Sequence, residues 1–83
     1  MSCVYILQSE RNQRFYVGST NDFERRFAEH QRGHSVATRG RGPWRLVYQE
    51  QFESLADARR RELEIKRWKS GRQIRALIAG SVG

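Results

Sequence analysis

The chain has 83 residues, of which 37% are hydrophobic and 30% are charged. This balance predicts one globular domain over residues 1–83 with a modest core, and it excludes a disordered chain. The net charge of +7 favours polyanionic partners, with nucleic acid first among them, although a basic protein can also be merely soluble.

The single cysteine, Cys3, lies at the start of an apolar run and can form no disulfide within the chain. A small domain without disulfides is typical of a reducing compartment, so we expect the cytoplasm, or the nucleoid if the protein meets DNA. No apolar run reaches the ~18–20 residues of a membrane span, and the N-terminus lacks the pattern of a signal peptide. We therefore expect no membrane partner.

Residues 3–8 and 14–19 have the β-branched and aromatic composition of strands, and a short polar turn joins them. An antiparallel hairpin with an even-numbered loop would place Tyr5 and Tyr16 on one sheet face, opposite or diagonal to each other. Gly18 in the second strand indicates that another group approaches the backbone closely there.

Residues 20–33 predict a helix with both ends marked. Asn21 and Glu24 fit a capping box, and Gly33 fits the position just after the helix. At about 100° per residue, Arg25 points outward from the face that should pack against the sheet. That face holds Phe23, Arg26, Phe27 and His30.

A loop rich in small residues, 33–43, carries Arg39 and Arg41 and precedes a third strand over residues 44–52. Strict alternation along that strand would place three large side chains on one face. These are Trp44, Leu46 and Tyr48.

Two helices should complete the chain. Ser54 with Asp57 opens the first, on which Leu55, Ala58, Glu62 and Ile65 form one stripe. Ser70 caps the second, whose inward residues are Ile74, Leu77 and Ile78, and Gly80 should end it before a frayed tail. The order β-β-α-β-α-α predicts an α+β fold, a small three-stranded antiparallel sheet flanked by helices.

Glu62 is a carboxylate where the helical period asks for an aliphatic residue, and a buried carboxylate needs a cation. Lys66 four residues on, a nearby arginine or a metal ion could supply it, and the pattern alone favours the ion pair with Lys66. By the same reasoning Arg26 and His30 read as a half-buried helix edge, and the two tyrosines as core residues.

The combination of these residues resembles the GIY-YIG nuclease superfamily, and specifically its small single-domain bacterial branch. Cys3-Val4-Tyr5 stands where that family has Gly-Ile-Tyr, and Tyr16-Val17-Gly18 stands where it has Tyr-Ile-Gly. Arg26 and His30 follow at the family's spacing, and Glu62 takes the place of its metal-binding glutamate. The resemblance covers residues 3 to about 78. Cys3 departs from the family's glycine, and we expect a strand to tolerate it.

The resemblance implies phosphodiester hydrolysis in DNA with Mg²⁺, or Mn²⁺ in its place, and no small-molecule cofactor. Selectivity for branched, nicked or single-stranded DNA stays open. Glu62 would hold the metal ion. Arg26 would bind a phosphate oxygen, and His30 would take a proton onward or orient a tyrosine. Tyr5 is the favoured residue for activating water, with Tyr16 assisting, although the sequence does not decide between them.

Four further cations are candidates for contacts with the sugar-phosphate backbone, which position a nucleic acid without specifying its sequence. They are Arg39, Arg41, Lys66 and Lys69. Two alternatives to an endonuclease stay open, a catalytically weak nucleic-acid-binding module on the same fold and a basic protein-interaction domain. The second of these leaves Glu62, Arg26 and His30 without a role.

Overall fold

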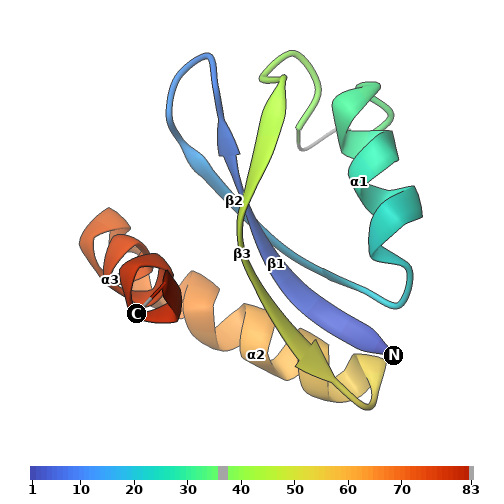
Figure 1. Ribbon diagram of the computed structural model, residues 1–83, viewed down its shortest axis with the longest axis vertical. Coiled ribbons are helices and arrows are strands. Elements are labelled where there is room, and N and C mark those ends of the chain that lie inside the picture. Colours follow the sequence, from blue (N-terminus) through green and yellow to red (C-terminus); the bar gives the residue numbers. More distant parts are fainter. Residues whose placement is uncertain (36–37, 83) are drawn as a thin grey trace.

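The computed structural model of the protein describes residues 1–35 and 38–82. Its elements follow the predicted order β-β-α-β-α-α and form the predicted α+β fold (Figure 1). The predicted strand limits differ from the observed ones by a single residue at most. The elements are β1 (Ser2–Ser9), β2 (Phe15–Thr20), α1 (Phe23–Gln31), β3 (Trp44–Phe52), α2 (Leu55–Trp68) and α3 (Gly71–Val82).

The strands form one antiparallel sheet in the order β2-β1-β3, so β1 is central and β2 is an edge strand. In this register Tyr5 lies opposite Gly18, and Tyr16 lies opposite Leu7. Because directly paired residues project from the same face, the two tyrosines share a face in a diagonal arrangement. The prediction for the hairpin is therefore confirmed.

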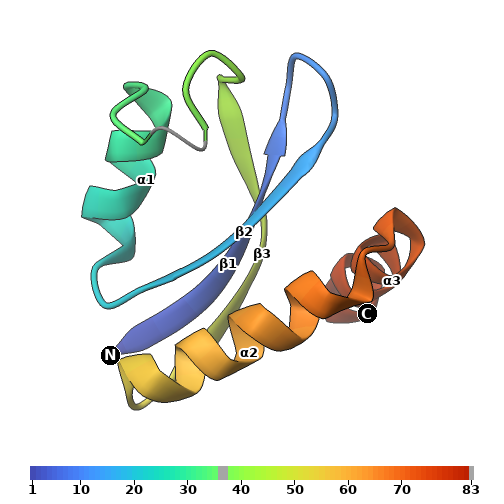
Figure 2. The same ribbon diagram turned by 180° about the vertical axis from the view of Figure 1, so that it is seen from behind.

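The two faces of the sheet are covered by different helices. Helix α1 lies on one side, and α2 and α3 lie on the other (Figures 1 and 2). Val4 and Ile6 of β1 pack toward α2, where they meet Ala58 and Ile65. The residues that alternate with them pack toward α1, with the phenylalanines of that helix; they are Cys3, Tyr5 and Leu7. Cys3 is thus a small buried side chain.

The prediction that Trp44, Leu46 and Tyr48 share one face is wrong. The pairing of β1 with β3 shifts at one point, because Leu7 pairs with Leu46 whereas the preceding Ile6 pairs with Tyr48. This β-bulge inserts an extra residue and reverses which face the following side chains occupy. Trp44 consequently packs on the α1 side, and Tyr48 packs on the side of α2 and α3.

Two predictions about helix ends also need correction. The N-cap of α1 is Asp22 instead of Asn21, and its carboxylate accepts a hydrogen bond from the backbone N–H of Arg25. Gly80 does not end the last helix, since α3 continues to Val82. Gly33 does follow α1 as predicted, with a φ of 76°. Residues 36–37 of the predicted loop and Gly83 of the predicted tail lie outside the described residues.

The remaining helix predictions are confirmed. The Ser54 hydroxyl accepts a hydrogen bond from the backbone N–H of Asp57 and caps α2, and Ser70 caps α3 in the same way. The inward residues of α3 pack against the core cluster on that side of the sheet. Among the described residues, no helix has the length and apolarity to cross a lipid bilayer.

Candidate active site

Tyr5 lies at the centre of the α1 side of the sheet and is 1% exposed. Its ring contacts Phe23 edge-on at 5.4 Å between centroids, and its centroid lies 6.4 Å from that of Tyr16. The hydroxyl passes directly over Gly18, where an added Cβ would lie 2.5 Å from the oxygen. The close approach predicted at Gly18 is therefore the approach of Tyr5 itself.

His30 is buried on α1 and has a partner at each ring nitrogen. Nε2 lies 2.8 Å from the Tyr5 hydroxyl, and Nδ1 lies 2.8 Å from the hydroxyl of Thr38. A neutral imidazole donates at one nitrogen and accepts at the other, so either tautomer satisfies both contacts. Burial lowers the pKa of His30 to about 4, and the positive charge of Arg26 adds to this effect. His30 is consequently neutral at physiological pH.

Arg26 lies one helical turn before His30 and is only partly exposed. Its guanidinium donates to the carboxylate of Glu29 at 3.0 Å and to the hydroxyl of Ser35 at 3.3 Å. Arg25, the next residue along α1, points outward and has a side chain that is 64% exposed. The predicted assignment of these two arginines to different helix faces is confirmed.

Glu62 reaches the sheet from α2, on the opposite side from α1. Its Oε1 accepts a hydrogen bond of 2.5 Å from the hydroxyl of Ser19, and its Oε2 contacts the ammonium of Lys66 at 2.5 Å. Ser19 pairs with Val4, so its side chain projects toward α2 from the edge strand β2. The predicted ion pair between Glu62 and Lys66 is present.

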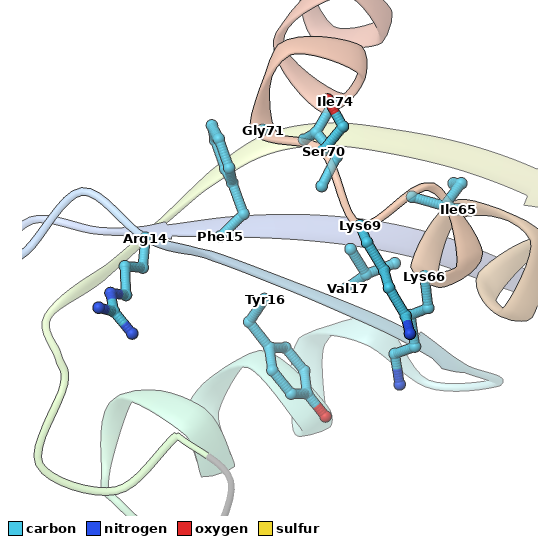
Figure 3. Close-up of a pocket in the computed structure, with 10 residues that line it drawn as sticks. All are labelled: Arg14, Phe15, Tyr16, Val17, Ile65, Lys66, Lys69, Ser70, Gly71 and Ile74. Carbon is cyan, nitrogen blue, oxygen red and sulfur yellow. The ribbon is translucent and has the colours of Figure 1, made fainter.

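Lys66 links the two halves of the site around the edge of the sheet. Its Nζ is bonded to Glu62 and also lies 6.0 Å from the centre of the Tyr16 ring. Figure 3 shows the Lys66 side chain extending from α2 in the same direction as Tyr16 does from β2. The Glu62 carboxylate and the tyrosine cluster, which consists of Tyr5, Tyr16 and His30, therefore meet at β2, although they belong to opposite faces of the sheet.

The structure limits how a metal ion could be held. The described residues contain no group of three or more His, Cys, Asp or Glu side chains that could chelate one. Glu62 is the carboxylate that adjoins the tyrosine cluster, and its side chain is 18% exposed. A metal ion here would depend mainly on water and on a ligand's own oxygens.

The four predicted backbone-binding cations do not lie together. Lys66 and Lys69 line one cavity of about 710 Å³ beside Tyr16 (Figure 3). Arg39 instead donates a hydrogen bond to the backbone carbonyl of Gly33, and the carbonyl of Arg41 accepts one from the Ser9 hydroxyl. Those two arginines are exposed on the loop between α1 and β3.

Several residues that contact the predicted site or line the neighbouring cavity had no part in the site predictions, and three of them matter most here. Ser19 holds Glu62, Thr38 holds His30, and Arg14 lines the cavity with the two lysines. Ser19 directly follows Gly18, which is a sequence signal that could have drawn attention to it. Thr38 carries no such signal, because its contact depends on the path of the loop.

Comparison with known families gives a match over most of the chain. A family model described as "GIY-YIG catalytic domain" matches residues 1–74, which include every residue of the site.

Individual proteins are similar over nearly their whole length. A UPF0213 protein of Clostridium perfringens is 37% identical over 99% of this chain and 88% of its own length. A UPF0213 protein of Natronomonas pharaonis is 42% identical over 96% of this chain and 93% of its own. The solution NMR structure of a UPF0213 protein from Bacillus halodurans is 40% identical, with a TM-score of 0.61 over 95% of this chain and 84% of that one.

Proposed function

Because the chain belongs to the GIY-YIG catalytic domain family, we propose that it is a divalent-metal-dependent endonuclease that hydrolyses phosphodiester bonds in DNA. The observation that carries the proposal is the convergence of two tyrosines and a histidine, with Arg26 beside Tyr5, close to the carboxylate of Glu62. The proposal includes a single domain over residues 1–83, a place in the cytoplasm and no small-molecule cofactor.

Glu62 suits Mg²⁺, which keeps several water ligands and is often bound by one or two carboxylates together with substrate phosphate oxygens. The position already attracts a cation, since Oε2 of Glu62 contacts the ammonium of Lys66. When bound, Mg²⁺, or Mn²⁺ in its place, would neutralise negative charge on the phosphate and on the leaving oxygen.

Tyr5 is the residue to which we assign activation of the attacking water, with His30 as the onward acceptor of the proton. The neutral imidazole lies 2.8 Å from the Tyr5 hydroxyl and can accept at Nε2. Burial raises the pKa of Tyr5 well above its ordinary value, and Tyr16 and Glu62 add to the rise while Arg26 opposes it. Neutralising the charge on Glu62 would therefore remove one cause of that rise.

In the reaction the water oxygen bonds to phosphorus, one P–O bond to a sugar breaks, and the leaving oxygen takes up a proton. Arg26 binds a non-bridging oxygen, where negative charge increases. To do so it must exchange Glu29 for the phosphate, which costs little because partly exposed ion pairs are worth about 0–1 kcal/mol. Tyr16 donates a hydrogen bond to the water or the phosphate.

The test is cleavage of labelled single-stranded, duplex, flap and four-way DNA with Mg²⁺, Mn²⁺ or EDTA. We expect cutting that EDTA abolishes and that Glu62→Gln loses. Activity that persists in Glu62→Gln would show that the proposed site is not the source of the cleavage.

Arg25 and Arg26 provide a matched pair for the same assay. Arg26→Ala should lower the cleavage rate by about 10²–10³-fold, the usual cost of removing a donor to developing charge. Arg25→Ala removes the same charge from an exposed position and should have a far smaller effect. Equal losses would contradict the role of Arg26.

One observation favours a second candidate, a nucleic-acid-binding module with little or no catalysis. Both carboxylate oxygens of Glu62 already have protein partners, Ser19 and Lys66, which compete with a metal ion. Salt-sensitive DNA binding without cutting under any metal condition would support the module over the enzyme.

A further inference from the structure

A groove runs between β2 and the junction of α2 with α3, next to the proposed site. We propose that this groove binds an unpaired DNA strand adjacent to the phosphodiester that is cut, an inference that rests on the proposed function. The cavity has a volume of about 710 Å³. It is lined by basic, aromatic and small residues from three segments: Arg14, Phe15, Tyr16, Val17, Ile65, Lys66, Lys69, Ser70, Gly71 and Ile74 (Figure 3).

The charge of the groove is entirely positive. Its lining includes Arg14, Lys66 and Lys69 and no carboxylate. Within the part of the chain that the structure describes, no carboxylate forms an ion pair with Arg14 or Lys69, so no ion pair has to break before either cation meets a phosphate. Unpaired cations that face one cavity are suited to phosphate groups, which release bound counterions when they are neutralised.

The groove is continuous with the proposed catalytic residues. Tyr16 lines it and also belongs to the tyrosine cluster, at a ring distance of 4.9 Å from His30. Lys66 lines it and holds Glu62. A strand that lies in the groove therefore places its neighbouring phosphate at Tyr16 and Glu62.

The size of the groove favours one strand over a duplex. Its volume falls within the ~300–1,000 Å³ typical of pockets for small molecules. Phe15 is half-buried and projects from β2 on the opposite side from Tyr16 (Figure 3), where its ring can stack on an unpaired base of a strand that crosses the edge of β2. In a duplex the bases stay stacked on one another, so only an unpaired strand can use both the cations and this ring.

The experiment is fluorescence anisotropy with the full chain in EDTA, which measures binding without cleavage. The probes are a labelled single-stranded oligonucleotide and a blunt duplex of the same sequence. The test variant is Arg14→Gln with Lys69→Asn, because Lys69 has a φ of 49° and asparagine tolerates that conformation. The control, Arg32→Gln with Arg59→Gln, removes the same charge from exposed positions outside the groove.

We expect the groove variant to bind the single strand about tenfold more weakly, and its slope of log K against log salt to fall by about 1.4, or ~0.7 for each lost contact. The control variant should bind the single strand with nearly the affinity of the wild type. The groove variant and the control variant should change the affinity for the duplex by equal amounts. Equal losses in the two variants, or an equal loss of duplex and single-strand binding in the groove variant, would overturn the proposal.

This result is independent of the chemistry. Loss of single-strand binding in the groove variant, combined with a wild type that never cuts DNA, would support the groove and refute the nuclease. Cleavage by the wild type, combined with unchanged single-strand binding by the groove variant, would support the nuclease and refute the groove.

Discussion

At the scale of single residues, Gly18 is required because the Tyr5 side chain occupies the space where a Cβ would be. An added methyl group would lie 2.5 Å from the Tyr5 oxygen and 2.6 Å from Cζ, and both atoms belong to a rigid, buried ring. The ring cannot give way without leaving its contact with His30. The glycine is thus tied to the position of the tyrosine hydroxyl.

We predict that Gly18→Ala lowers the stability of the protein by about 1–3 kcal/mol, the usual cost of overpacking, and impairs cleavage even where the chain remains folded. Urea denaturation and a cleavage assay measure the two effects. A variant that keeps full activity would show that the tyrosine hydroxyl need not hold this position.

Lys66 holds Oε2 of Glu62 and adds a positive charge beside any metal ion at that carboxylate. Lys66→Met should therefore strengthen Mn²⁺ binding. The gain should be at most about fivefold, because ion pairs at exposed positions are worth only ~0.2–1 kcal/mol. Electron paramagnetic resonance of free Mn²⁺ measures the affinity, and Arg67→Met, at the adjacent exposed position, is the control. Weaker binding in Lys66→Met would mean that the lysine orients the carboxylate for the metal.

At the scale of elements, local sequence patterns predict the hairpin and all three helices, because hydrophobic periodicity and most helix caps depend on residues that are close in the sequence. The bulge in β3 could not be predicted in this way. It depends on how Ile6 and Leu7 pair with a strand about 40 residues away, and strict alternation assumes that no residue is inserted. The N-cap of α1 differed from the prediction by one residue, since Asn21 and Asp22 are both good caps.

The continuation of α3 through Gly80 gives a prediction about two glycines. Among the described residues, and apart from the chain neighbours and the backbone of α3 itself, no atom lies within 4 Å of a Cβ added at Gly80, and its φ is not positive, so Gly80→Ala should stabilise the protein by about 0.5–1 kcal/mol. Gly33→Ala should instead destabilise it by about 1–2 kcal/mol, because Gly33 has a φ of 76°. Urea denaturation of both variants measures the difference. A loss of stability in Gly80→Ala would place the end of α3 at that residue, as the sequence alone suggested.

At the scale of the whole molecule, the site is assembled from both sides of the sheet. The resemblance identified Tyr5, Tyr16, Arg26, His30 and Glu62 as candidates, and the fold brings them close together: Tyr5 contacts His30 and lies beside Arg26, and Tyr16 lies between His30 and the Lys66 that holds Glu62. The sequence did not reveal that Glu62 reaches the edge strand β2 from the opposite face of the sheet. The partners of the site, Ser19 and Thr38, also escaped prediction, because each contacts a residue of another element whose position depends on the tertiary structure.

The burial of His30 connects this site to the stability of the whole chain. The pKa of His30 is about 4 in the folded protein, against an ordinary value of 6.5, because of burial and the charge of Arg26. Between those two pH values the unfolded chain binds a proton at His30 that the folded chain does not. The folded state is therefore favoured less as the pH falls from 6.5 toward 4, and above that window His30 adds no pH dependence to the stability.

We predict that the free energy of unfolding falls between pH 6.5 and pH 5 by up to about 1.4 kcal/mol per pH unit on account of His30. Because carboxylates also begin to titrate near the lower limit, the measurement is the difference between the wild type and His30→Gln, followed by urea denaturation at each pH. Glutamine can accept from Tyr5 and donate to Thr38 but does not titrate, so its curve should be flatter across this range. Parallel curves for the two proteins would mean that the pKa of His30 lies near its ordinary value, and that the imidazole is charged when it contacts Tyr5 in mildly acidic solution.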